Sequence, residues 1–256
     1  MFTPKGKFGW YELMTSDTKA AGKFYSDVVG WTTQLMPGTD GGPDYTIFSL
    51  GKVGIAGMLT IPGHTAWVGY IDVADVDAHI EKIVEAGGKL LRPATDVPGM
   101  LRFAVMSDPQ GAAIVVFTPN PAMPSPERPA PPTPGTIGWH ELYTTDLDAG
   151  FDFYHKLFGW TKLSDMDMGP MGLYRLFDEG DHKEMGDGGM MTKAPQIPVS
   201  CWNFYFNVDS IKAAIERVKS GGGKVLNGPM QVPGGAWIIN GQDPLGAMFS
   251  LVSDKE

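Results

Sequence analysis

A tryptophan–glutamate pair that occurs twice is the arrangement in this sequence best suited to chemistry. GWYELMTSD at 9–17 returns later in the chain as GWHELYTTD, and the alternation of side chains along a strand puts Trp10 beside Glu12, and Trp139 beside Glu141, on one face. A carboxylate enclosed by aromatic side chains loses hydration, which disfavours its charged form and suits it to general acid or base catalysis. A structural alternative stays open, with each glutamate held by an arginine, a tyrosine or backbone amides and each tryptophan packed in a core.

Two tyrosines on a second kind of strand complete the candidate catalytic set. Tyr70 lies in WVGYID, and Tyr205 lies in the corresponding segment WNFYFN. Alternation gives Val68 and Tyr70 a common face, and likewise Asn203 and Tyr205. Each tyrosine hydroxyl would serve as a hydrogen-bond partner of a glutamate. The candidate catalytic residues are therefore Glu12, Glu141, Tyr70 and Tyr205.

These residues occupy matched positions because the whole chain is duplicated. Aromatic residues recur 129 positions apart, with Trp10, Phe24, Tyr25 and Trp31 matching Trp139, Phe153, Tyr154 and Trp160. A later set recurs 135 positions apart, with Trp67, Gly87, Gly88, Asp108 and Pro109 matching Trp202, Gly222, Gly223, Asp243 and Pro244. The second copy thus holds about six extra residues near 181–188, and a repeat of this length is a whole domain rather than one turn of a solenoid.

A proline-rich strap separates the two copies. The run TPNPAMPSPERPAPPTPG lacks backbone donors at its many prolines and favours an extended polyproline conformation. We predict a first domain at 1–118, a linker at 119–134 and a second domain at 135–256.

Apolar spacing and turn signals predict two βαβββ units in each domain. In the first domain a strand at 8–14 precedes a helix that Asp17 caps and Gly30 ends, and three strand-like runs follow. A strand at 67–73, a helical stripe closed by a glycine pair and three more strands repeat the pattern. The fold class is therefore α+β, with tandem paired βαβββ modules.

Composition describes a water-soluble globular chain. Of its 256 residues, 43% are hydrophobic and 19% are charged, and the net charge of -9 argues against nucleic acid or an anionic membrane as a partner. The sequence contains neither an apolar run long enough to span a membrane nor a signal-peptide pattern, so we expect a cytoplasmic protein. The single cysteine, Cys201, allows neither an internal disulfide nor a cysteine metal cluster.

Several motifs together resemble the vicinal oxygen chelate superfamily. They are the helix segments FYSDVVGW and FYHKLFGW, the glycine pairs after the second helices, and the turns DPQG at 108–111 and DPLG at 243–246. That superfamily includes glyoxalase I, extradiol dioxygenases and bleomycin resistance proteins, and the chain looks closest to two-domain bacterial glyoxalase-like members. The resemblance implies that each domain is a cup, meaning a cup-shaped, mostly antiparallel sheet with helices outside.

The resemblance also implies where a metal would be held. Members of the superfamily bind a metal at the floor of the cup through His, Glu or Gln at four strand positions. Those positions correspond to Trp10, Gly57, Val68 and Val115 in the first domain and to Trp139, Gly189, Asn203 and Ser250 in the second. A catalytic metal needs about three donor side chains, and these positions do not supply them. We therefore predict no metal and no cofactor.

The same positions are expected to line a binding site. Small residues on the fourth strand would leave space there, and the methionines that follow would give adaptable apolar contact, although the glycines could equally mark strand bulges. The candidate ligand-binding residues are Trp10, Trp139, Gly57, Met58, Val68, Val115, Gly189, Met190, Asn203 and Ser250.

The histidines are expected to be structural or solvated. His140, like Tyr11 in the first copy, should point away from the cup and pack under a helix. His182 lies in the inserted segment DHKEMG beside Asp181 and Glu184. A local metal site could be drawn there, but charged loops are usually solvated.

Three hypotheses of function remain. The first is a metal-independent glyoxalase-like or bleomycin-resistance-like protein that binds a small organic molecule. The second is a lyase, isomerase or hydroxylase that uses Glu12 or Glu141 as an acid or base. The third is a metal-dependent glyoxalase or dioxygenase whose ligands lie elsewhere. We expect a monomer with pseudo-symmetric domains, with a homodimer as the alternative.

Overall fold

The computed structural model describes residues 6–38, 42–122, 127–180 and 184–256. His182 and Asp181, which the sequence offered as part of a local metal site, lie outside the described residues.

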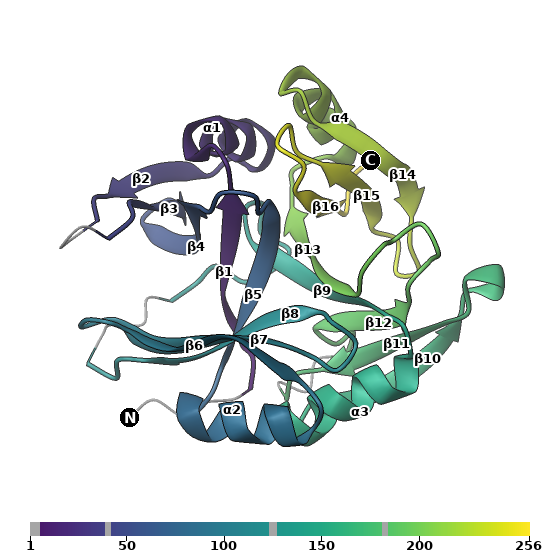
Figure 1. Ribbon diagram of the computed structural model, residues 1–256. Helices are drawn as coiled ribbons and strands as arrows, with labels where there is room; N and C mark the ends of the chain where they lie inside the picture. Colours follow the sequence, from purple (N-terminus) through teal and green to yellow (C-terminus); the bar gives the residue numbers. More distant parts are fainter. Residues whose placement is uncertain (1–5, 39–41, 123–126, 181–183) are drawn as a thin grey trace. The chain divides into compact units, whose positions relative to one another are not determined.

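The first repeat contains ten elements in two successive βαβββ modules (Figure 1). The first module comprises β1 (Phe8–Thr15), α1 (Thr18–Val29), β2 (Thr32–Met36), β3 (Tyr45–Leu50) and β4 (Val53–Thr60). The second comprises β5 (Ala66–Asp72), α2 (Val76–Glu85), β6 (Lys89–Val97), β7 (Leu101–Ser107) and β8 (Ala113–Pro119).

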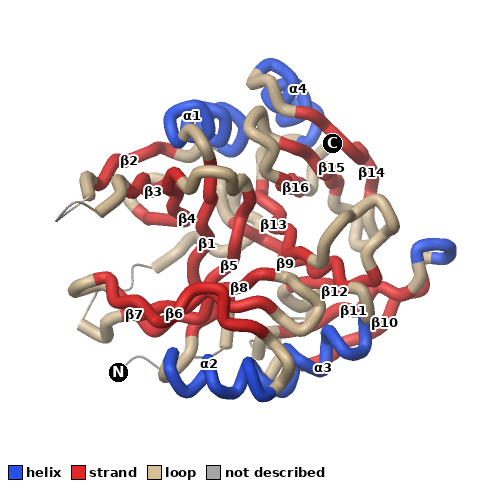
Figure 2. Tube along the Cα trace, viewed as in Figure 1, coloured by secondary structure: helices blue, strands red, loops and turns tan. Residues whose placement is uncertain are grey.

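The second repeat follows the same order, as the alternation of helix and strand colours in Figure 2 shows. Its first module comprises β9 (Ile137–Thr144), α3 (Leu147–Phe158), β10 (Thr161–Asp167), a short 3-10 turn η1 (Gly169–Met171), β11 (Leu173–Asp178) and β12 (Gly188–Thr192). Its second comprises β13 (Cys201–Asn207), α4 (Ile211–Ser220), β14 (Lys224–Gln231), β15 (Trp237–Gln242) and β16 (Met248–Ser253). The predicted α+β class and tandem paired modules are confirmed.

Each repeat forms one eight-stranded mixed sheet. The strand orders are β2-β3-β4-β1-β5-β8-β7-β6 and β10-β11-β12-β9-β13-β16-β15-β14. The pairs β1/β4, β5/β8, β9/β12 and β13/β16 are parallel, whereas the hairpin neighbours within each module are antiparallel. Identical orders in the two repeats make residues at equal register directly comparable.

Helix boundaries follow the predicted capping signals. The side chain of Asp17 accepts hydrogen bonds from the amides of Lys19 and Ala20 at the start of α1, and Gly30 ends the helix with a φ of 89°. Asp146 and Gly159 do the same for α3. A positive φ is accessible to glycine at little cost, which explains why each of these helices stops before the sequence GW.

The described chain separates into two compact units that cut across the repeats. Of the described residues, unit I comprises 6–9, 68–122, 140–180 and 184–202, and unit II comprises 10–38, 42–67, 127–139 and 203–256. Each unit therefore combines one module from the first repeat with one module from the second. Within unit I, α2 packs on α3, and within unit II, α1 packs on α4.

A buried hydrogen-bond chain joins the two repeats inside unit II. The indole Nε1 of Trp67 donates to the hydroxyl of Tyr25 at 2.8 Å, and that hydroxyl donates to Oδ2 of Asp243 at 3.1 Å. The other carboxylate oxygen of Asp243 accepts hydrogen bonds from the amides of Leu245, in the DPLG turn, and Ala247, directly after it. A tyrosine of the first repeat is thus tied to a turn of the second.

Unit I contains an equivalent series of hydrogen bonds, in which the tyrosine belongs to the second repeat and the aspartate to the first. Trp202 donates to the hydroxyl of Tyr154 at 2.9 Å, and Tyr154 donates to Asp108 at 3.2 Å. Burial raises the pKa of Tyr154 well above the ordinary value for tyrosine, and it also raises the pKa of Asp108. The phenol therefore stays protonated and donates.

The tryptophan of each GW motif is hydrogen-bonded to the segment just before the first strand of a repeat. Trp31 Nε1 donates to the carbonyl of Gly135 at 2.7 Å within unit II, and Trp160 Nε1 donates to the carbonyl of Gly6 at 2.6 Å within unit I. Four of the duplicated pairs, Tyr25/Tyr154, Trp31/Trp160, Trp67/Trp202 and Asp108/Asp243, thus take part in a buried hydrogen-bonded framework within each unit.

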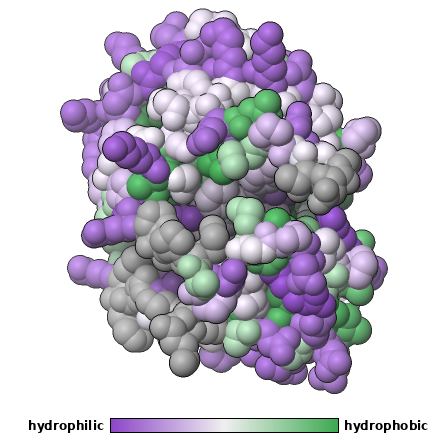
Figure 3. All heavy atoms as spheres, turned by 90° about the vertical axis from the view of Figure 1, so that its left-hand side faces the viewer, coloured by the Kyte–Doolittle hydropathy of each residue, from purple (hydrophilic) through white to green (hydrophobic). Residues whose placement is uncertain are grey.

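No helix in the described part of the chain is both long and apolar enough to cross a membrane. On the face drawn in Figure 3, hydrophobic side chains lie scattered among hydrophilic ones.

Stability should depend on pH through Asp243. Because burial raises its folded-state pKa, the folded chain holds this proton more tightly than the unfolded chain does. The resulting stabilisation is complete below the unfolded pKa of about 4 and is lost as the pH rises through the folded pKa. Asp243→Asn keeps an acceptor for the turn amides without the titrating proton. In urea titrations, its free energy of unfolding relative to the unmodified protein should increase as the pH rises from about 4 to about 8.

The exposed Asp27, which pairs with Lys23 on α1, provides the control, because Asp27→Asn should not show this increase. A difference between Asp243→Asn and the unmodified protein that stays constant with pH would contradict the assignment.

The helix-facing side of β1 should carry much of the stability. Leu13 is fully buried, whereas Leu35 on β2 is 58% exposed. Leu13→Ala should lower the free energy of unfolding by about 2–5 kcal/mol, because it leaves a cavity in a packed core. Leu35→Ala is the matched control and should change it by less than about 1 kcal/mol. Equal costs for the two variants in urea unfolding would show that the faces of β1 are assigned wrongly.

Candidate functional site

The sequence-predicted site residues are divided between the two compact units. Unit II contains Trp10, Glu12, Gly57, Met58, Trp139, Asn203, Tyr205 and Ser250, and unit I contains Val68, Tyr70, Val115, Glu141, Gly189 and Met190. Residues predicted for one cup thus fall in different units, and each group is described within its own unit.

Trp10, Tyr45 and Glu12 form a hydrogen-bonded cluster in unit II. The indole Nε1 of Trp10 donates to the Tyr45 hydroxyl at 2.9 Å, and Tyr45 also hydrogen-bonds to the carboxylate of Glu12. Burial raises the pKa of Tyr45 above its ordinary range, and the negative charge of Glu12 raises it further. Tyr45 therefore keeps its proton and donates it in a hydrogen bond to Glu12.

Tyr45 was missed by sequence reasoning, although a signal was present. It begins the third strand of the first repeat, and Tyr174 holds the matching place in β11. Comparison of the two copies at this strand would have identified both tyrosines.

The glycines on the fourth strands make room for these tyrosine rings. A Cβ added to Gly57 would lie 2.0 Å from the hydroxyl oxygen of Tyr45, and one added to Gly189 would lie 2.1 Å from the ring of Tyr174. Gly57 is in register with Glu12 on the neighbouring strand. The space that the sequence assigned to a ligand beside these glycines is occupied by a tyrosine ring in each unit, because only glycine allows the ring to lie against the strand.

Met58 and Met190 lie among core side chains. Met58 is in register with Leu13 and Met190 with Leu142, and all four side chains are at most 1% exposed. The methyl group of Met58 approaches Gly22 of helix α1. Alternation along the strands therefore places both methionines on the helix-facing side, which corrects the expectation that they line the same side as Glu12.

Arg128 from the proline-rich strap covers one side of this cluster. Its guanidinium carbon lies 5.6 Å from the centre of the Trp10 ring, in a cation–π arrangement. The strap thus contributes a charged group next to Trp10 within unit II.

The corresponding glutamate in unit I, Glu141, is bonded to a tyrosine of its own strand. Glu141 is 5% exposed and accepts a short hydrogen bond from the hydroxyl of Tyr143, two residues along β9. Burial, and then the charge of Glu141, raise the pKa of the nearby Cys201 thiol to about 11. The thiol is therefore protonated at neutral pH, and this environment does not activate it as a nucleophile.

The residues predicted around Tyr70 form an apolar group. Val68, Tyr70 and Val115 are 1–5% exposed, and Tyr70 is in register with Val115. The Tyr70 ring packs against Phe117 and Phe103, with ring centres 5.9 and 6.2 Å apart.

The matching strands in unit II carry a polar group, which we call the amide–hydroxyl cluster (Asn203, Tyr205, Asn240 and Ser250). Asn203 Nδ2 and Asn240 Nδ2 each donate to Ser250 Oγ at 2.7 Å, and Asn240 Nδ2 lies 3.3 Å from the Tyr205 hydroxyl. The structure thus brings three predicted residues together and adds Asn240. A comparison of the antiparallel hairpins of the two copies, Val105 against Asn240, could have found it.

The four strand positions of each repeat do not fit a metal. Val68 and Val115 offer no donor atom, and Asn203 and Ser250 are hydrogen-bonded to each other. Within residues 6–38, 42–122, 127–180 and 184–256, no group of three or more His, Cys, Asp or Glu side chains is arranged to hold a metal ion.

His140 contributes to a buried structural pair instead. It is 7% exposed, its Nδ1 lies 3.2 Å from Glu179 Oε1, and its ring centre lies 4.4 Å from that of Phe8. Burial raises the pKa of Glu179, and the neighbouring His140 opposes that rise. Glu179 also accepts a hydrogen bond from the backbone amide of Phe8.

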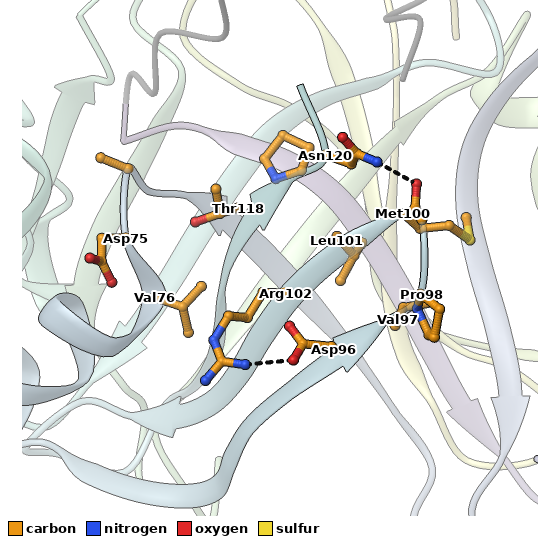
Figure 4. A pocket seen from close by; sticks show the side chains of 13 residues that line it. Asp75, Val76, Asp96, Val97, Pro98, Met100, Leu101, Arg102, Thr118 and Asn120 are labelled. Atoms are coloured by element: carbon orange, nitrogen blue, oxygen red, sulfur yellow. Dashed lines mark hydrogen bonds and ion pairs between the residues drawn. The ribbon is translucent and has the colours of Figure 1, made fainter. Parts of the chain in front are cut away.

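A surface cavity of about 480 Å³ lies elsewhere, between the start of α2 and the β6–β7 hairpin in unit I. Arg102 points toward Asp96 within it, as Figure 4 shows, and it also pairs with Asp77. The cavity is lined by none of the sequence-predicted site residues, and its arginine is already neutralised by two carboxylates.

Curated relatives match nearly the whole chain. A Mycobacterium tuberculosis protein named as a candidate glyoxylase, CFP32, is 32% identical over 258 residues, covering 97% of this chain and 95% of the relative. The Streptomyces peucetius anthracycline biosynthesis protein DnrV is 31% identical over 277 residues, covering 100% of this chain and 95% of the relative.

Solved structures share the fold at low sequence identity. The Mn(II)-bound glyoxalase from Novosphingobium aromaticivorans superposes with a TM-score of 0.68 at 15% identity, covering 100% of this chain and 84% of that one. The 2,3-dioxygenase LapB from Pseudomonas sp. KL28 gives 0.64 at 14% identity, covering 99% and 93%.

The family comparison agrees with the duplication. Residues 7–116 and 136–251 each match the Glyoxalase/Bleomycin resistance protein/Dioxygenase superfamily. The resemblance drawn from the motifs is therefore confirmed, and the chain belongs to the Glyoxalase/Bleomycin resistance protein/Dioxygenase superfamily.

Proposed function

We propose that this protein binds a small organic molecule and needs no metal to do so. The proposal is supported by the side chains that stand at the strand positions where superfamily members carry their metal ligands. Two of these positions are valines, and Asn203 and Ser250 are bonded to each other. A bound metal requires about three donors that are free to turn toward it.

The ligand is a planar aromatic molecule. Trp10 and Trp139 stand at equivalent strand positions, and indole rings provide large flat surfaces for stacking. Among the relatives, DnrV is named for anthracycline biosynthesis, and anthracyclines are fused-ring aromatic compounds. These features support an aromatic ligand over a small aliphatic one.

The proposal also includes the domain boundaries, the cellular location and the oligomeric state. The domains extend over 1–118 and 135–256, which the family matches at 7–116 and 136–251 support. The protein is a cytoplasmic monomer, since the net charge of -9 favours solubility.

An enzyme that uses Glu12 or Glu141 as an acid or base is the second candidate. The hydrogen bonds from Tyr45 to Glu12 and from Tyr143 to Glu141 favour it, because each holds in place a carboxylate that could take or give a proton. Each carboxylate, however, is already engaged by a tyrosine of the protein itself. Binding without turnover is therefore the leading proposal.

Ligand binding should survive removal of metal. Native mass spectrometry of protein treated with EDTA should show less than about one-tenth equivalent of transition metal and should retain the organic molecules that co-purify with the untreated protein. Return of Zn²⁺, Ni²⁺ or Fe²⁺ should not raise the unfolding temperature, because a metal that does not bind the folded state cannot stabilise it. Stoichiometric metal that restores lost ligand binding would refute the proposal.

Substitution of the glutamates separates binding from catalysis. Glu12→Gln and Glu141→Gln keep the size and an acceptor oxygen for the tyrosine, so we expect an unfolding free energy within about 1 kcal/mol of the unmodified protein. For a binding protein the co-purifying ligand should persist in both variants. If the unmodified protein converts that ligand and either variant abolishes conversion without loss of binding, the enzyme hypothesis replaces ours.

A further inference from the structure

The two repeats differ at one group of matched strand positions. Asn203, Asn240 and Ser250 of the second repeat correspond to Val68, Val105 and Val115 of the first. Their registers are the same, because Asn240 pairs with Ser250 as Val105 pairs with Val115, and Tyr205 pairs with Ser250 as Tyr70 pairs with Val115. The first repeat therefore shows that this fold accepts valine at all three positions.

The polar side chains at these positions are costly to the folded state. Asn203 is 7% exposed and Ser250 is fully buried. Within the described residues, the Oδ1 atom of Asn203 is buried and accepts no hydrogen bond. Such an atom loses its contact with water and gains nothing in return. Valine at the matched positions of the first repeat avoids this cost of desolvation. The polar residues therefore indicate a function in the second repeat.

The hydrogen bonds of the cluster lead from the surface to this buried atom. Asn227 on β14 is exposed, and its Nδ2 donates to Asn240 Oδ1 at 3.2 Å. Asn240 is half-buried and donates to Ser250, which also accepts from Asn203. Because Ser250 Oγ already accepts two hydrogen bonds, its own hydrogen is available for donation to a third group.

We infer that the amide–hydroxyl cluster recognises a neutral hydroxyl group of the ligand. The ligand O–H donates to Asn203 Oδ1, and the ligand oxygen accepts a hydrogen bond from the Ser250 hydroxyl. This inference rests on the proposed small-molecule binding, and it assigns recognition of the hydroxyl to the second repeat alone.

A neutral hydroxyl fits this cluster better than a charged group. The described contacts of Asn203, Asn240 and Ser250 are with amides and hydroxyls. An ion buried among such groups would lose its hydration without a compensating opposite charge. An ether or ketone would offer no proton to the Asn203 acceptor.

The inference is tested by replacing the polar residues of the second repeat with the valines found at the matched positions of the first. The variant Asn203→Val/Ser250→Val copies Val68 and Val115 into the second repeat. The probes are 2-naphthol, which has a neutral aromatic hydroxyl, and 2-methoxynaphthalene, which has the same rings and an acceptor but no donor. Calorimetry should show that the unmodified protein binds 2-naphthol at least about tenfold more tightly, as a buried hydrogen bond requires.

The double variant should lose this preference, and its unfolding temperature should equal or exceed that of the unmodified protein. Gln34→Val, a polar-to-valine change on the exposed strand β2, should keep the preference. If the double variant does not fold, Ser250→Ala should reduce the preference in the same direction. A preference retained in the double variant or in Ser250→Ala, or absent from the unmodified protein, overturns the inference. The proposed function is judged separately by the co-purifying ligand.

Discussion

Each compact unit depends on a tyrosine hydroxyl that is buried in the core, where all its hydrogen-bond partners must come from the protein. Tyr25 and Tyr154 are fully buried, and each accepts a hydrogen bond from a tryptophan and donates one to the aspartate of a DPxG turn. A buried hydroxyl without partners would destabilise the fold, so the three residues are useful only together. In each unit the tyrosine comes from one repeat and the aspartate from the other, so both repeats are needed to complete each set of hydrogen bonds.

Because this framework is common to both units, the side chains on matched strands can differ between the two repeats. On the first repeat, Val68 and Val115 surround Tyr70 and continue an aromatic and aliphatic core. On the second, Asn203 and Ser250 carry hydrogen bonds into a region of the sheet that valine could fill. Neither pair resembles a metal site. Tyr45 hydrogen-bonds to Glu12 from β3, and Tyr143 hydrogen-bonds to Glu141 from the same strand, β9.

Much of the fold was predictable because its signals are local and occur twice. Asp17 and Gly30 mark the ends of a helix through capping chemistry that acts within a few residues. The site was less predictable because its contacts join distant strands. Gly57 was expected to leave space, but Tyr45, twelve residues earlier, occupies it. Asn240 could be recognised only once its register with Ser250 was known.

The most direct test of the account is the side-chain amide signal of Asn203. In the ¹⁵N-labelled, metal-free protein, saturation with 2-naphthol should shift the NH₂ resonances of Asn203 and Asn240. Those of Asn120, which bonds the Gly99 carbonyl in unit I, should stay unchanged. The account predicts this localised response because a new hydrogen bond to one oxygen of an amide polarises its NH₂ group. Shifts confined to residues outside the amide–hydroxyl cluster would contradict it.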